Sequence, residues 1–184
     1  MLNIKALLEA RALGGSGGSG GSGGGGDEAL IGLIERTATE ITVPNGCTIV
    51  GNSCFTGYAA LVQISLPESV TKLGVSSFKD CTNLALTSLP TSITSIGESA
   101  FYRCTKLALT SIPAGVEKLG YEIFYSCTNL TEMTFKGTPS TISNNVFSGC
   151  TNLVTINVPW AEGAVANAPW GATKATINYN YTGA

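Results

Sequence analysis

The sequence predicts a β-rich solenoid, a rod of stacked coils held together by parallel strands. Phenylalanine recurs at an unbroken interval of 23 residues, and two apolar columns keep the same interval. These three columns comprise Phe55, Phe78, Phe101, Phe124 and Phe147; Leu61, Leu84, Leu107, Leu130 and Leu153; and Val50, Leu73, Ile96, Leu119, Ile142 and Val165. A unit of this length cannot bury its own apolar face, so successive copies must stack and share one core.

Three segments precede the repeats. Residues 1–13 place apolar side chains on one side and charges on the other, which predicts a short amphipathic helix that docks to a partner or self-associates. A homotrimer is the assembly that a fibre would require. Residues 14–26 contain only Gly and Ser, which predicts a flexible linker of about 20 Å; a Gly-rich bundle of several chains and an engineered linker are the alternatives. Residues 27–37 start with two acidic residues and carry apolar residues at helical spacing, which predicts a helix that caps the first coil.

Residues 38–184 are the predicted solenoid with its C-terminal cap. In one coil, the segment 61–67 (LVQISLP) is a strand entered from a turn, and the segment 69–74 (SVTKLG) is a shorter extended stretch. The following residues SSFKDCTN bring Phe78 and Cys81 into the core. Equivalent strands of neighbouring coils pair in parallel at roughly 4.8 Å.

Proline and glycine columns mark the corners of the coil. Proline cannot donate a hydrogen bond to a strand ladder, and glycine tolerates a positive φ, so both residues fit positions where the chain turns. The proline column, which Lys136 interrupts, comprises Pro44, Pro67, Pro90, Pro113 and Pro159, and the glycine column comprises Gly51, Gly74, Gly97 and Gly120.

The repeat pattern extends to the C-terminus and departs from the consensus at two strand positions. Counting in steps of 23 places Trp170 in the phenylalanine column, and Tyr179 and Tyr181 in the columns of Ile156 and Val158, which predicts an aromatic cap strand. Thr87 and Thr110 replace an apolar strand residue, and a leucine lies one step earlier in both coils, at Leu86 and Leu109.

Composition limits the classes of partner. The net charge is −2 and only 12% of residues are charged, with no basic stripe, which argues against nucleic-acid binding. No apolar run approaches the roughly 20 residues of a membrane span, so no membrane insertion is expected. Glu9 and Arg11 stand where a secretory signal would be apolar, so no Sec signal is expected.

The cysteines predict core packing rather than chemistry. Cys81, Cys104, Cys127 and Cys150 form another 23-residue column, whose parallel Cβ vectors do not suit a disulfide. Buried free thiols are therefore expected. The chain has no histidine and no CxxC motif, so we expect no metal site, no cofactor and no enzymatic activity.

The units CTNLALTSLPTSITSIGESAFYR and CTNLTEMTFKGTPSTISNNVFSG resemble the BspA-type leucine-rich repeat, over residues 38–181. The resemblance implies a curved, right-handed solenoid that is presented on cell surfaces or virions for adhesion and protein binding. A docking helix, a Gly-rich spacer and a recognition domain together also resemble tail or fibre-associated proteins of phages from gut Gram-positive bacteria. That resemblance implies a virion or extracellular location without a Sec signal, with a cytoplasmic location as the alternative.

Two faces are candidate binding sites for a protein or glycan on a cell surface. One is the outward row of the first strand, which comprises Gln63, Ser65, Leu86, Ser88, Leu109, Ser111, Glu132, Thr134, Thr155 and Asn157. The other is the turn after each phenylalanine, where otherwise repetitive units carry unlike residues, namely Lys79, Asp80, Tyr102, Arg103 and Tyr125. Tyrosine and arginine dominate binding hot spots. The competing hypothesis is a structural or decoration protein whose solenoid contacts only its own assembly.

Overall fold

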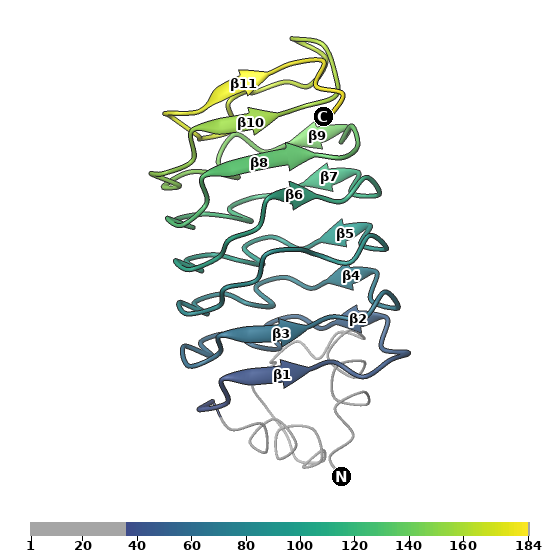
Figure 1. Cartoon of the computed structure of the whole chain (residues 1–184), viewed down its shortest axis with the longest axis vertical. Coiled ribbons are helices and arrows are strands. Elements are labelled where there is room, and N and C mark those ends of the chain that lie inside the picture. The colour runs from purple at the N-terminus through teal and green to yellow at the C-terminus, as the bar shows by residue number, and fades with distance from the viewer. Residues whose placement is uncertain (1–35, 184) are drawn as a thin grey trace, which may run out of the picture.

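The computed structural model describes residues 36–183, which form a solenoid of coils stacked along its long axis (Figure 1). The predicted β-rich solenoid is therefore confirmed. Each coil has three sides, which we call the front, the back and the turn side. Every pairing between strands is parallel, as expected when each coil repeats the path of the coil before it.

The front side carries the longer strands. They are β1 Glu40–Thr42, β3 Gln63–Ser65, β6 Ser111–Ile112, β8 Glu132–Phe135, β10 Thr155–Asn157 and β11 Thr176–Asn178. The back side carries two-residue strands, namely β2 Ile49–Val50, β4 Lys72–Leu73, β5 Ser95–Ile96, β7 Lys118–Leu119 and β9 Thr141–Ile142. The back sheet is continuous in the order β2-β4-β5-β7-β9, whereas the front divides into β1-β3 and β11-β10-β8-β6.

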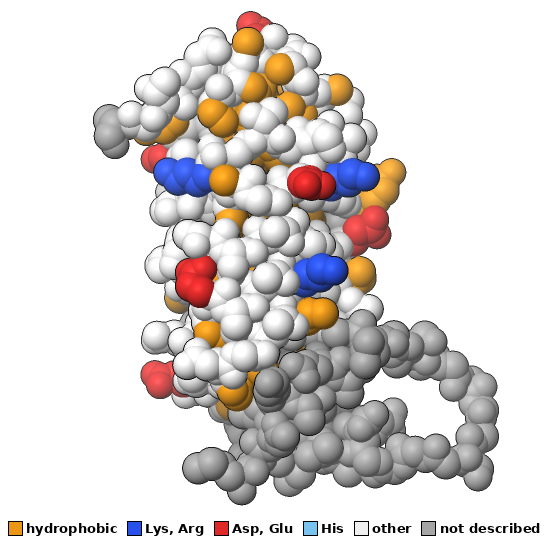
Figure 2. All heavy atoms as spheres, turned by 90° about the vertical axis from the view of Figure 1, so that its right-hand side faces the viewer, with side chains coloured by type: hydrophobic (Ala, Val, Ile, Leu, Met, Phe, Trp, Pro, Cys, Tyr) orange, Lys and Arg blue, Asp and Glu red, His pale blue; other side chains and the backbone are white. Residues whose placement is uncertain are grey.

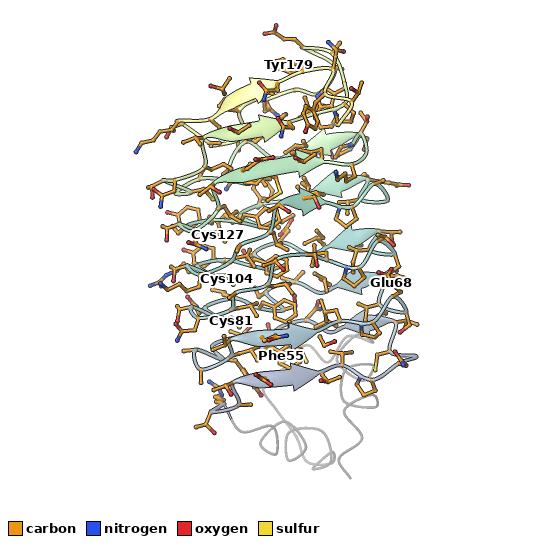
Figure 3. All side chains as sticks on the ribbon, in the orientation of Figure 1. Phe55, Glu68, Cys81, Cys104, Cys127 and Tyr179 are labelled. Carbon is orange, nitrogen blue, oxygen red and sulfur yellow. The ribbon has the colours of Figure 1, made fainter. Side chains whose placement is uncertain are left out.

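The interior is a set of columns along the rod. The five phenylalanines of the repeat are fully buried, and neighbouring rings stack with centroids 5.3 to 5.7 Å apart and planes within 16° of each other. The cysteine column lies beside them, one thiol above the next (Figure 3). Each thiol of this column donates to a backbone carbonyl of the preceding coil, for example Cys81 Sγ to Phe55 O at 3.0 Å. The predicted columns and free buried thiols are thus confirmed.

The front sheet is interrupted in the coil that contains residues 85–90. No strand forms there, and Thr87 and Thr110 are both exposed. Leu109 is buried, and Leu86 packs against the core from a half-buried position. The leucine one step earlier therefore fills the core in place of the missing apolar strand residue. This shift by one residue breaks the alternation of inward and outward side chains that a strand requires.

The glycine column has a different cause from the predicted one. Its members do not adopt a positive φ. The residue two positions after each glycine adopts it instead, namely Ser53, Ser76, Ser99 and Glu122. At Gly74 and Gly97, glycine is needed instead because the backbone of the preceding coil approaches closely, whereas Gly120 meets only the Glu98 side chain. A Cβ on Gly74 would lie 2.5 Å from the backbone nitrogen of Asn52.

The C-terminal register also differs from the prediction. Trp170 is fully buried, as expected for its column. However, β11 pairs with β10 through Ile177 opposite Ile156, so the last strand lies two residues earlier than a strict interval of 23 places it. Tyr179 and Tyr181 follow this strand and are half-buried, so the cap strand consists of Thr, Ile and Asn rather than tyrosines.

The N-terminal predictions lie almost wholly outside the described residues. These are the docking helix of residues 1–13, the linker of residues 14–26 and residues 27–35 of the capping helix. Arg36 and Thr37, the last two residues of that predicted helix, lie in a turn. The described residues contain no helix, so the capping helix has no support there.

Candidate functional site

The turn side brings five predicted residues together into what we call the turn-side ladder: Lys79, Asp80, Tyr102, Arg103 and Tyr125. Each coil places two residues between its phenylalanine and its cysteine. Because the phenylalanine and cysteine side chains fill the core, these two residues lie at the surface, where Arg103 is exposed and the other four members of the ladder are half-buried. Stacking of coils then lines them up along the rod.

Specific contacts order the ladder. The rings of Tyr102 and Tyr125 stack with centroids 4.8 Å apart and an interplanar angle of 6°. The Lys79 ammonium lies 4.8 Å from the centroid of the Tyr102 ring, within the range of a cation–π interaction. Beside them, Arg103 Nη1 lies 3.6 Å from Asp80 Oδ1, with the two side chains 59% and 36% exposed. Such an exposed ion pair orients side chains more than it stabilises the fold.

The backbone holds these side chains in place. Asp80 and Arg103 have positive φ angles of 59° and 57°, and Ser126 continues the column at 55°. Their N–H groups each donate to a carbonyl of the next coil at 2.8 Å, as Asp80 does to Tyr102 and Arg103 to Tyr125. The ladder therefore rests on a rigid backbone, which lowers the conformational entropy that a partner must overcome on binding.

The front side exposes only part of the predicted row. Gln63, Ser65, Ser88 and Glu132 are exposed, and Leu86, Ser111 and Thr155 are half-buried. The prediction is wrong for Leu109, Thr134 and Asn157, which are 1%, 7% and 3% exposed. Leu109 fails because it replaces Thr110 in the core.

Thr134 and Asn157 are buried within a polar network between strands. Asn157 Nδ2 donates to Glu132 Oε1 at 3.0 Å and to Thr134 Oγ1 at 3.1 Å. Asn178 Nδ2 in turn donates to Asn157 Oδ1 at 2.8 Å. These bonds join β8, β10 and β11 and engage the buried side chains of Thr134 and Asn157, which are therefore structural and not available to a partner.

The front side contains a cleft that the sequence did not predict. This cleft has a volume of about 510 Å³ and lies where the front sheet is interrupted, between residues 62–68 and residues 85–90. We call it the front cleft. The one sequence signal near it was the replacement of an apolar strand residue by Thr87 and Thr110. The sequence could not predict the cleft itself, because a cleft depends on how far neighbouring backbones separate.

The thiols of Cys81, Cys104, Cys127 and Cys150 offer no reactive group. Burial raises the pKa of Cys81 and of Cys150 to about 12, and it raises the pKa of Cys104 and of Cys127 well above the ordinary value of 9.0. A thiol in this state is neither a nucleophile nor a metal ligand at neutral pH. In the part of the chain that the structure describes, no three His, Cys, Asp or Glu residues are grouped as a metal site requires.

The described residues also contain no helix with the length and apolarity needed to span a bilayer. On the face seen in Figure 2, charged side chains occur singly or in pairs of mixed sign among uncharged polar groups.

Comparison with known proteins agrees with this geometry. The chain is similar to a leucine-rich repeat protein of T. pallidum, with 25% identity and a TM-score of 0.60 over 79% of this chain and 71% of that one. It is also similar to a leucine-rich repeat protein of Bacteroides ovatus, with 22% identity and a TM-score of 0.50 over 76% of this chain and 43% of that one. No curated protein sequence matches the chain.

The family model for the BspA type leucine-rich repeat region matches residues 35–159 in six copies. This range covers the coils that carry the phenylalanine and cysteine columns, the turn-side ladder and the front cleft. The chain therefore belongs to the BspA-type leucine-rich repeat family.

Proposed function

We propose that this chain is a non-enzymatic recognition module that binds a protein or glycan on a cell surface through its turn-side ladder. The observation that carries the proposal is the ordered stack of Lys79, Tyr102 and Tyr125 beside the Arg103–Asp80 pair. Repeat proteins use the regular surfaces of stacked coils to bind partners. Tyrosine and arginine side chains on a rigid backbone supply contact area at a low entropic cost.

The finer assignment is a phage tail or virion-associated protein that recognises a host surface. It rests on the sequence order of a short amphipathic segment, a Gly/Ser tract and a repeat domain. We propose that residues 1–13 dock to the virion or self-associate, with the module placed on the virion or outside a cell. The competing role is a structural protein whose solenoid contacts only its own assembly, and a cytoplasmic location would favour that role.

Binding to isolated cell envelopes of gut Gram-positive bacteria tests the module. We expect the wild-type chain to sediment with envelopes, and Tyr102→Ala and Tyr125→Ala to weaken this binding about tenfold each, as loss of a hot-spot aromatic does. Tyr121→Ala is the matched control, because Tyr121 is 60% exposed but lies outside the ladder.

Equal loss of binding in Tyr121→Ala and Tyr102→Ala would refute the ladder as the site. An absence of envelope binding, together with loss of particle assembly when residues 1–26 are deleted, would favour the structural role. Measurement of the oligomeric state separates a fibre-like homotrimer from a single-copy module.

A further inference from the structure

The front cleft has an unpaired strand edge as one wall. β3 pairs with β1, and among the described strands it has no second partner. Ala85 N–H donates to Val62 O at one end, and Thr94 N–H donates to Thr71 O further along the coil, both at 2.9 Å. Between these two points, no backbone hydrogen bond joins the described residues 63–69 to residues 86–92.

The open groups belong to alternate residues of β3. Gln63 and Ser65 bond to the coil below, through Gln63 N–H to Thr39 O and Val43 N–H to Ser65 O. In a parallel ladder, alternate residues bond to opposite neighbours, so the N–H and C=O of Ile64 face the cleft. Polar backbone groups in a partly enclosed site are suited to receiving another main chain.

The size of the cleft fits a short extended segment. Its volume of about 510 Å³ is within the range of small binding sites. At a rise of roughly 3.3 Å per residue, an extended segment as long as the three-residue strand β3 would lie along it. Residues 85–90 form no strand beside β3, and Leu86 rather than Thr87 packs against the core there.

The lining chemistry favours a peptide with one cationic side chain. Apolar groups alternate with hydroxyl and amide groups, and the lining contains no aromatic ring on which a sugar could stack and no cation. Its only charge is Glu68, at the corner away from the cysteine column (Figure 3). The Glu68 carboxylate is held in place by Thr91 N–H and Thr91 Oγ1, at 3.3 and 2.9 Å, and by Ser92 N–H at 3.2 Å.

We propose that the front cleft binds an extended peptide segment of a partner protein, which adds a strand to the free edge of β3 and places a Lys or Arg side chain near Glu68. This mode of recognition takes affinity from main-chain hydrogen bonds and selectivity from alternate side chains. The cleft lies on the front side and shares no residue with the turn-side ladder, so this proposal stands independently of the function proposed above.

A displayed library of random eight-residue peptides, selected on the full chain, tests this proposal. We expect enriched peptides to share a Lys or Arg at one fixed position. Ser88→Trp, which fills the cleft from its exposed rim, is expected to weaken their binding about tenfold or more. Ser111→Trp is the matched control, because Ser111 occupies the same column one coil further and does not line the cleft. It is expected to change the affinity by less than about twofold.

N-methylation of the selected peptide, one backbone nitrogen at a time, gives a second readout. Strand addition predicts loss of binding at alternate residues only, because alternate N–H groups face β3. Failure to enrich any peptide, equal effects of Ser88→Trp and Ser111→Trp, or N-methyl losses without a period of two would each overturn the proposal. Binding of a glycan array that Ser88→Trp abolishes would assign the cleft to a glycan instead. Tyr102→Ala should leave peptide binding unchanged, which separates this site from the ladder.

Discussion

The close approach of neighbouring coils predicts that Gly97→Ala destabilises the solenoid. An added Cβ on Gly97 would lie 2.5 Å from the carbonyl carbon of Gly74 and 2.7 Å from its oxygen, and it would also meet the backbone nitrogen of Val75. These atoms belong to the preceding coil, and no side-chain rotation can move them away. The two coils must therefore separate locally to accept a single methyl group.

The expected magnitude follows from that separation. Ordinary carbon contacts need about 3.4 Å or more, so the backbones must move apart by about 1 Å, at a cost of roughly 2–3 kcal/mol for overpacking. Alanine restricts the unfolded chain and returns about 0.5 kcal/mol. The net loss is about 2 kcal/mol, which lowers Tm by about 4–8 °C in a domain of this size.

Gly120→Ala is the matched control in the same column. There the nearest atom is Cγ of the Glu98 side chain at 3.0 Å, and this side chain can rotate toward solvent. We expect its stability to stay within about 0.5 kcal/mol of the wild type. Urea denaturation followed by circular dichroism measures both variants. If Gly97→Ala were as stable as Gly120→Ala, close backbone approach would not be the reason that glycine occupies position 97.

Four further predictions concern buried and hydrogen-bonded groups. Ser77 is fully buried and its hydroxyl has no partner in the described structure, so Ser77→Ala should stabilise the chain by about 1 kcal/mol in urea denaturation, and a loss of stability would contradict this. Burial raises the pKa of Cys81 and of Cys150 to about 12. The free energy of unfolding should therefore be highest below pH 9.0, the ordinary thiol pKa, and fall as the pH rises from there toward 12, because in this range only the thiols of the unfolded chain ionise. An unchanged Tm over that range would refute this prediction. The same thiols should react with a thiol reagent only after denaturation. Hydrogen bonds from Thr91 lower the pKa of Glu68 below 4.5, so its stabilising effect should be present above pH 4.5 and lost as the pH falls through the lowered value, a change in Tm that Glu68→Gln should reduce.

The repeat interval identified most of the core because equivalent residues in a solenoid share one environment. The phenylalanine, leucine and cysteine columns follow from the sequence, and the structure buries them as predicted. The turn-side ladder was also predictable, because a residue between two inward columns must point outward. The sequence could not show that Tyr102 and Tyr125 stack face to face, since that depends on side-chain rotamers and the spacing of coils.

The errors arose where one coil departs from its neighbours. Leu109 was placed outward by counting, but it is buried because a coil fills its core with whichever apolar side chain can reach it. The last strand lies two residues early because the chain shortens its final loop and keeps Ile177 beside Ile156. Pairing and burial outweigh a strict interval in both cases.

The sequence by itself determined that the chain stacks repeated coils, which residues fill most of the rod, and which two residues of each turn face outward. Those features depend only on periodicity and on the need to bury apolar groups. The tertiary structure alone decided the purpose of the glycine column, the polar network that buries Asn157, and the open edge of β3 beside the front cleft. These depend on how closely two backbones approach each other, which is a property of the packed coils and not of any one repeat.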